Sequence, residues 1–82
     1  MSERVAYALY VRPLDKPHEK PTQIDVFKSM YKAATCGTNL HNLLKDTHDV
    51  FVSQKTMIPI DYGCFNTKEE YYNIDGTERQ IS

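Results

Sequence analysis

Four side chains carry the donor atoms that zinc prefers, namely the thiols of Cys36 and Cys64 and the imidazoles of His41 and His48. Four residues separate Cys36 from His41, six separate the two histidines, and fifteen separate His48 from Cys64. This spacing matches no zinc finger or zinc ribbon, and no Cys-x-x-Cys pair anchors the set. We therefore predict no metal site and no cofactor.

Neither cysteine is placed as a catalytic nucleophile. A reactive thiol needs a nearby base and a group that orients this base. Cys36 precedes Gly37 near the expected end of a helix, where the negative end of the helix dipole disfavours the thiolate. Cys64 lies between Gly63 and Phe65 and reads as a small apolar side chain that fills space.

The carboxylates do not indicate acid–base catalysis either. Asp46 and Asp49 flank His48, and Glu69 adjoins Glu70, in segments that read as polar turns. Acid–base groups need an apolar cleft that shifts their pKa values, whereas carboxylates in turns are normally solvated. The chain also has only three glycines and no glycine-rich phosphate loop. We expect a protein that is not an enzyme.

The aromatic residues offer a different chemistry, because six tyrosines and three phenylalanines make up 11% of the chain. Aromatic side chains on a sheet face beside Lys and Arg are typical of proteins that bind single strands. The tyrosines on predicted strands or their flanks are Tyr7, Tyr10, Tyr62, Tyr71 and Tyr72. The cations that could accompany them are Lys55, Lys68 and Arg79. Binding of single-stranded nucleic acid, or of a nucleotide or other small ligand, is therefore one hypothesis.

Binding of another protein is the hypothesis that we favour. Tyrosine is enriched at protein interfaces because it buries a large area and keeps a polar tip. A chain of 82 residues buries only about 60–65% of the surface of its unfolded form, so its core cannot hide every aromatic ring. The predicted partner-binding residues are Tyr10, Tyr62, Tyr71, Tyr72, Lys68 and Arg79. The partner would be an unidentified protein, and a homo-oligomer is an alternative.

Composition limits the class of protein further. The net charge of −1 lacks the basic excess of a duplex binder and the acidity of a DNA mimic. No apolar run approaches the roughly 18–20 residues that span a bilayer, and residues 1–5 lack the features of a signal peptide. We expect a cytoplasmic protein without membrane contact, in which Cys36 and Cys64 are reduced thiols, although a bridge between them stays open.

In size and in its lack of catalytic residues, the chain resembles in general character the small host-takeover proteins of bacteriophages. This resemblance rests on no motif. Independently of it, we expect the protein to act as an inhibitor, an adaptor or a small subunit by covering a surface of its partner. The resemblance itself implies a phage-type host-takeover or anti-defence protein.

The order of elements follows from hydrophobic periodicity. Alternating residues from Val5 to Val11 predict a strand, and three prolines make residues 12–21 a semi-rigid polar loop. Apolar residues at helical spacing predict a helix over 23–36, which Gly37 ends. Leucines after Thr38 predict a second, shorter helix that ends near Lys45.

The second half of the chain is predicted as strands. Residues 50–60 form a hairpin that turns near Gln54 and Lys55, with Pro59 in an edge segment. The pair Asp75-Gly76 predicts a second hairpin between residues 71–74 and 77–81. The expected fold is a single α+β domain over residues 1–82, with the order β-α-α-β-β. Two helices would pack on one face of a small antiparallel sheet.

Overall fold

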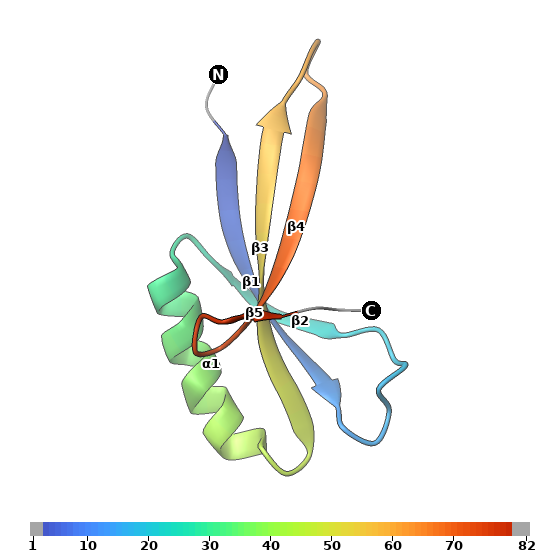
Figure 1. The fold of residues 1–82 in the computed structure, drawn as a ribbon, viewed down its shortest axis with the longest axis vertical. Helices are drawn as coiled ribbons and strands as arrows, with labels where there is room; N and C mark the ends of the chain where they lie inside the picture. The colour runs from blue at the N-terminus through green and yellow to red at the C-terminus, as the bar shows by residue number, and fades with distance from the viewer. Residues whose placement is uncertain (1–2, 80–82) are drawn as a thin grey trace.

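The computed structural model describes residues 3–79 and contains one helix and five strands (Figure 1). The elements are β1 (Arg4–Pro13), β2 (Thr22–Phe27), α1 (Met30–Leu44), β3 (His48–Pro59), β4 (Phe65–Asn73) and β5 (Glu78–Arg79). All neighbouring strands pair antiparallel in the order β2-β1-β3-β4-β5. The prediction of two helices on a small sheet is therefore wrong, because most of the chain belongs to one large sheet.

The first error concerns residues 22–27, which form the edge strand β2 in place of the start of a helix. The spacing of apolar residues in this segment is ambiguous. Ile24 and Val26 lie two residues apart, as in a strand, but Ile24 and Phe27 lie three apart, as in a helix. Pairing with β1 decides the conformation of this segment. The helix begins later, after Ser29, whose hydroxyl accepts a hydrogen bond from the Lys32 backbone N–H at 3.2 Å.

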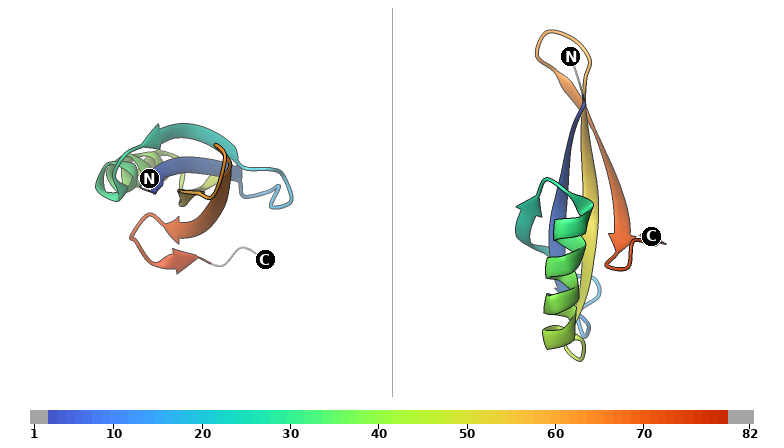
Figure 2. Two further views of the ribbon diagram at one scale, coloured as in Figure 1. Left: turned by 90° about the horizontal axis from the view of Figure 1, so that it is seen from above. Right: turned by 90° about the vertical axis from the view of Figure 1, so that its left-hand side faces the viewer.

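The second error concerns Gly37, which lies inside α1 and does not end it. A Cβ atom at this position would lie 2.9 Å from Cγ2 of Ile74 and 3.1 Å from Cδ1 of Leu9. Gly37 is therefore a point of close approach between the helix and the sheet. The two predicted helices are one continuous helix, which contains Gly37. Figure 2 shows this helix lying against one face of the sheet.

The third error concerns residues 48–59, which form one continuous strand with no turn at Gln54 and Lys55. The chain reverses after Pro59 instead, where Tyr62 and Gly63 both have positive φ angles, of 45° and 77°. Neither Gln nor Lys favours such angles, whereas Gly adopts them without strain. β3 consequently pairs along its length with β4, from Phe51 opposite Asn73 to Pro59 opposite Phe65.

Two local predictions are confirmed. The N-terminal strand is present as β1, and the chain turns at Asp75-Gly76, with Gly76 at a φ angle of 90°. The Asn73 backbone N–H donates to the Thr77 carbonyl at 2.9 Å, which closes the turn between β4 and β5. Residues 80 and 81 of this predicted hairpin lie outside the described residues.

The hydrophobic core lies between α1 and the face of the sheet that it covers. Its buried residues are Leu9, Val11, Ala33, Val50 and Val52. Partly buried residues pack around them, namely Tyr7, Phe27, Met30, Cys36, Leu40, Leu44 and Ile74. The helix spans only the lower half of the sheet in Figure 1, and the β3–β4 hairpin extends well beyond it. Within residues 3–79, no helix is long and apolar enough to cross a membrane.

Candidate functional site

The face of the sheet opposite α1 carries an aromatic cluster of three rings from three adjacent strands. Tyr10 lies directly across from Phe51 in the β1–β3 pairing, and their rings stack with centroids 5.6 Å apart. The ring of Tyr71, on β4, lies 6.0 Å from that of Phe51 and is tilted by 58°. Phe51 is fully buried although no helix covers it, so the cluster is a second, smaller core.

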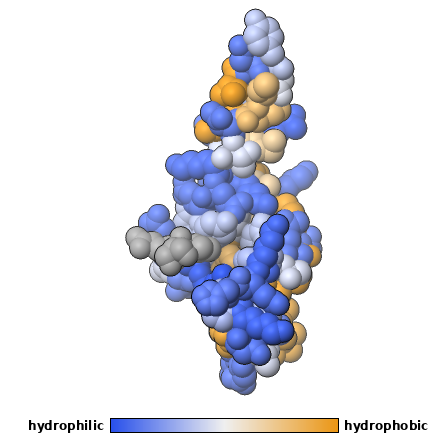
Figure 3. Space-filling view, turned by 90° about the vertical axis from the view of Figure 1, so that its right-hand side faces the viewer, coloured by the Kyte–Doolittle hydropathy of each residue, from blue (hydrophilic) through white to orange (hydrophobic). Residues whose placement is uncertain are grey.

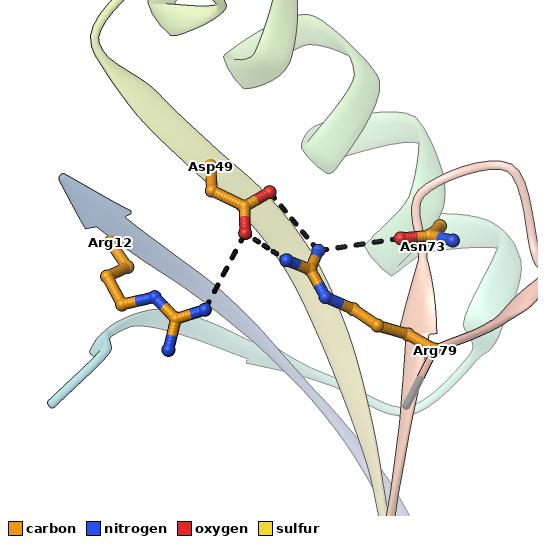
Figure 4. Close-up of polar contacts among 4 residues, drawn as sticks. All are labelled: Arg12, Asp49, Asn73 and Arg79. Carbon is orange, nitrogen blue, oxygen red and sulfur yellow. Dashed lines mark hydrogen bonds and ion pairs between the residues drawn. The ribbon is translucent and has the colours of Figure 1, made fainter. Parts of the chain in front are cut away.

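Arginine side chains complete the cover over Phe51. The guanidinium carbon of Arg79 lies 4.5 Å from the ring centre, and that of Arg12 lies 5.7 Å from it. Both arginines also contact the carboxylate of Asp49 (Figure 4). Arg79 donates to both oxygens of Asp49, through Nη1 at 3.2 Å and through Nη2, while Nη2 of Arg12 lies 3.8 Å from Oδ2. The planar guanidinium of Arg79 is thus held by a two-pronged ion pair.

An open groove of about 640 Å³ adjoins this cluster, and we call it the aromatic groove. It is lined by Tyr10, Lys20, Pro21, Gln23, Phe51, Lys55, Glu69 and Tyr71. Four strands or their flanks contribute these residues, and the loop between β1 and β2 supplies one wall. Its volume falls within the roughly 300–1,000 Å³ that is usual for sites of small ligands.

A chain of polar contacts crosses the aromatic groove. The hydroxyl of Tyr71 donates to the carboxylate of Glu69, which raises the pKa of Tyr71 to about 12. Nζ of Lys55 lies 3.7 Å from the same carboxylate and 5.5 Å from the ring centre of Tyr10. Hydrogen bonding to Tyr10 is the main cause that raises the pKa of Lys55. The side chain of Lys55 is therefore positively charged at physiological pH.

Ser53 lies between Phe51 and Lys55 along β3, with its side chain on the same face as theirs. It is fully buried, and its Oγ has no hydrogen-bond partner among residues 3–79. Buried hydroxyls normally make such a bond. An unsatisfied polar atom is thus buried on this face of the sheet, between two residues that line the aromatic groove.

The hairpin arm is a second candidate surface, and we define it as residues 57–67 at the end of β3, in the turn and at the start of β4. Figure 3 shows apolar residues gathered at this end of the molecule, above a body that is largely hydrophilic on the face in view. Tyr62 at the turn is 96% exposed and Ile60 is 56% exposed. Met57 and Phe65 are exposed as well, and Val5 lies beside the arm, opposite Thr56.

The structure distributes the predicted partner-binding residues over several places. Tyr10 and Tyr71 line the aromatic groove, Arg79 adjoins it over Phe51, and Tyr62 lies in the hairpin arm.

Tyr72 and Lys68 lie on the other face of β4, because side chains alternate along a strand. There the carboxylate of Glu70 accepts from the Tyr72 hydroxyl at 2.7 Å and contacts Nζ of Lys68 at 2.8 Å. These contacts raise the pKa of both Tyr72 and Lys68 and lower that of Glu70.

The groups that could bind a metal are not brought together. Among residues 3–79, no three Cys, His, Asp or Glu side chains are grouped so that they could hold an ion. Both cysteines are free thiols, with Cys36 half-buried on the core side of α1 and Cys64 exposed in the hairpin arm. His48 hydrogen-bonds to the hydroxyl of its neighbour Thr47 at 2.9 Å.

Sequence reasoning missed most of the aromatic groove. Gln23 and Glu69 come from an edge strand and a long hairpin that the predicted fold did not contain, and Lys20, in the predicted loop, was not expected to face the tyrosines. Phe51 lies between Val50 and Val52, in a segment that the sequence predicted only as a strand. The alternation of that segment could have indicated two buried faces, with the two valines on one face and Phe51 on the other.

Comparison of the chain with protein-family models, with curated proteins and with solved structures finds no match.

Proposed function

We propose that this protein is a non-enzymatic module that binds another protein through its hairpin arm. The observation that carries the proposal is an imbalance of apolar surface. Among residues 3–79, seven hydrophobic residues are buried and two of these are alanines, whereas ten large hydrophobic residues are exposed. Five of the ten gather at the hairpin end, namely Val5, Met57, Ile60, Tyr62 and Phe65.

The shape of the arm supports this proposal. The molecule measures 46 × 26 × 20 Å, and the hairpin extends along its longest axis, beyond the helix (Figure 1). A projecting hairpin gains nothing for its own core from Ile60 or Tyr62, since neither side chain packs under another element. Exposed apolar clusters of this kind mark interaction surfaces, in which aromatic side chains such as tyrosine are frequent central anchors. An inhibitor, an adaptor or a small subunit would use such a surface.

A cytoplasmic setting is part of this proposal. Cys36 and Cys64 are both unbridged, and Cys64 is exposed in the arm. Unbridged, accessible thiols suit a reducing compartment.

Site-specific photo-crosslinking in the native cell tests the proposal. A photoreactive phenylalanine analogue in place of Tyr62 should give a discrete crosslinked product, and the same analogue in place of Lys45, exposed after α1, should not. Covalent self-crosslinking would identify the partner as a second copy of this chain. Equal crosslinking from both positions, or none from either, would contradict a role for the arm.

Paired substitutions refine this test. Ile60→Ser with Tyr62→Ser should weaken binding of the crosslinked partner by at least about tenfold, which is typical of central interface residues. Tyr31→Ser with Leu43→Ser is the matched control, because both residues are 81% exposed and lie on α1, away from the arm. If the helix pair weakens binding as much as the arm pair, the interface lies elsewhere.

A further inference from the structure

We infer that the aromatic groove is a second binding site, which takes an aromatic base that carries a phosphate, supplied either as a free nucleotide or by single-stranded nucleic acid. This site lies on the face of the sheet opposite α1 and does not depend on the hairpin arm. Two features of the groove carry the inference, namely its rings and its local charge.

The rings provide a stacking surface. Tyr10 and Tyr71 are half-buried, and the ring of each packs against that of the fully buried Phe51. A ring that is already fixed loses little freedom when a base stacks on it. Pro21 and Gln23 also line the groove, so a planar ligand can contact an apolar pyrrolidine as well as the tyrosine rings.

The local charge is opposite in sign to that of the whole chain. The chain has 10 Lys and Arg against 11 Asp and Glu. In and beside the groove, four cations outnumber two carboxylates: Lys20, Lys55, Arg12 and Arg79 against Glu69 and Asp49. This excess of positive charge favours an anionic ligand, so it attracts a base that carries a phosphate more strongly than a neutral base alone.

The four cations differ in whether they already pair with a carboxylate. Lys55 pairs with Glu69, and Arg12 and Arg79 share Asp49, whereas Lys20 makes no ion pair within residues 3–79. Lys20 is therefore the free cation that would meet the phosphate. Glu69, an acceptor already held by Tyr71 and Lys55, suits the amino group of a base or a sugar hydroxyl.

Titration of the full chain with three probes tests the inference. The probes are inorganic phosphate, AMP and a fluorescein-labelled oligothymidylate of about ten nucleotides. At a low salt concentration of about 50 mM, amide resonances of the groove should shift with AMP or with the oligonucleotide, and affinity should fall as salt rises. An oligonucleotide that binds far more tightly than AMP identifies a single strand as the ligand, and equal affinities identify a free nucleotide.

Variants on the two faces of the sheet provide the control. Tyr71→Leu should weaken binding by about fivefold or more, as expected for the loss of one stacked base. Lys20→Gln, in the loop between β1 and β2, should reduce the salt dependence by about one ion. Tyr72→Leu and Lys68→Gln make the same chemical changes on the opposite face of β4 and should leave binding unchanged.

Three results would overturn the inference. The first is no binding of any probe, and the second is phosphate binding as tightly as AMP, which would mean that the rings contribute nothing. The third is equal weakening by the variants on both faces, which would mean that no specific site exists. Lys20→Gln keeps the test decisive if Tyr71→Leu does not fold, because Lys20 is an exposed loop residue.

Discussion

The guanidinium carbon of Arg79 lies 4.5 Å from the centre of the Phe51 ring, so the last described residue of the chain covers a buried ring on the central strand. The same guanidinium forms the ion pair with Asp49. These contacts hold the short strand β5, which pairs with β4 at only two positions, Tyr71 with Arg79 and Tyr72 with Glu78.

Arg79→Ala should therefore destabilise the fold by about 1–3 kcal/mol, because it removes both the cover over Phe51 and the partner of a half-buried carboxylate. Arg79→Lys should lose part of this stability, since lysine keeps the charge without the planar two-pronged contact. Urea denaturation measures the free energy of unfolding of both variants. Lys68→Ala serves as the exposed control, with an expected change of at most about 0.5 kcal/mol. A similar small loss for Arg79→Ala would contradict the proposed role.

Gly37→Ala should destabilise the protein, although alanine favours a helix by about 1 kcal/mol over glycine. The new methyl group would meet Cγ2 of Ile74 at 2.9 Å, and this atom is attached directly to the Ile74 Cβ and cannot move away easily. Overpacking of this kind costs about 1–3 kcal/mol. In a double-mutant cycle, Ile74→Ala should reduce the cost of Gly37→Ala; strictly additive effects would contradict the contact.

Tyr71 should titrate late, at a pKa of about 12, because its hydroxyl donates to the carboxylate of Glu69. Its unfolded pKa is 10.0, so its contribution to stability is complete below pH 10 and is lost as the pH rises towards 12. Ultraviolet titration of tyrosinate should show this late component. Glu69→Gln should move it to lower pH, and Tyr71→Phe should remove it; a late component that survives Tyr71→Phe would belong to another tyrosine.

Ser53→Ala should leave the stability of the free protein unchanged or raise it. The substitution removes a buried hydroxyl that has no partner, and the position is otherwise enclosed. Thermal unfolding at equal protein concentration measures the effect. A loss of about 1 kcal/mol would show that the hydroxyl makes a hydrogen bond in solution.

The two thiols should react at different rates with a thiol reagent such as Ellman's. Cys64 is exposed in the hairpin arm and should react rapidly, whereas Cys36, on α1, packs against the core and should react much more slowly. Cys64→Ser should remove the fast phase alone. Two thiols that react at the same rate would contradict the packing of Cys36.

Local interactions made some elements predictable. The strand at Val5–Val11 follows from strict alternation, and the turn at Asp75-Gly76 follows from the need for a positive φ angle. Both signals depend on residues that are adjacent in the chain. The presence of aromatic residues in excess of what a small core can hold was also evident from composition, and Tyr31 and Tyr62 are indeed exposed.

The sequence by itself determined where the chain is strongly β-forming and where a Gly-containing turn must lie, because these depend on neighbouring residues. Only the tertiary structure decided that residues 22–27 are a strand, since their pattern fits two periods and pairing with β1 resolves it. It also decided that Gly37 lies within a helix, because the contact with Ile74 joins residues far apart in the chain. The aromatic groove depends on the register of four strands, a property that no local pattern contains.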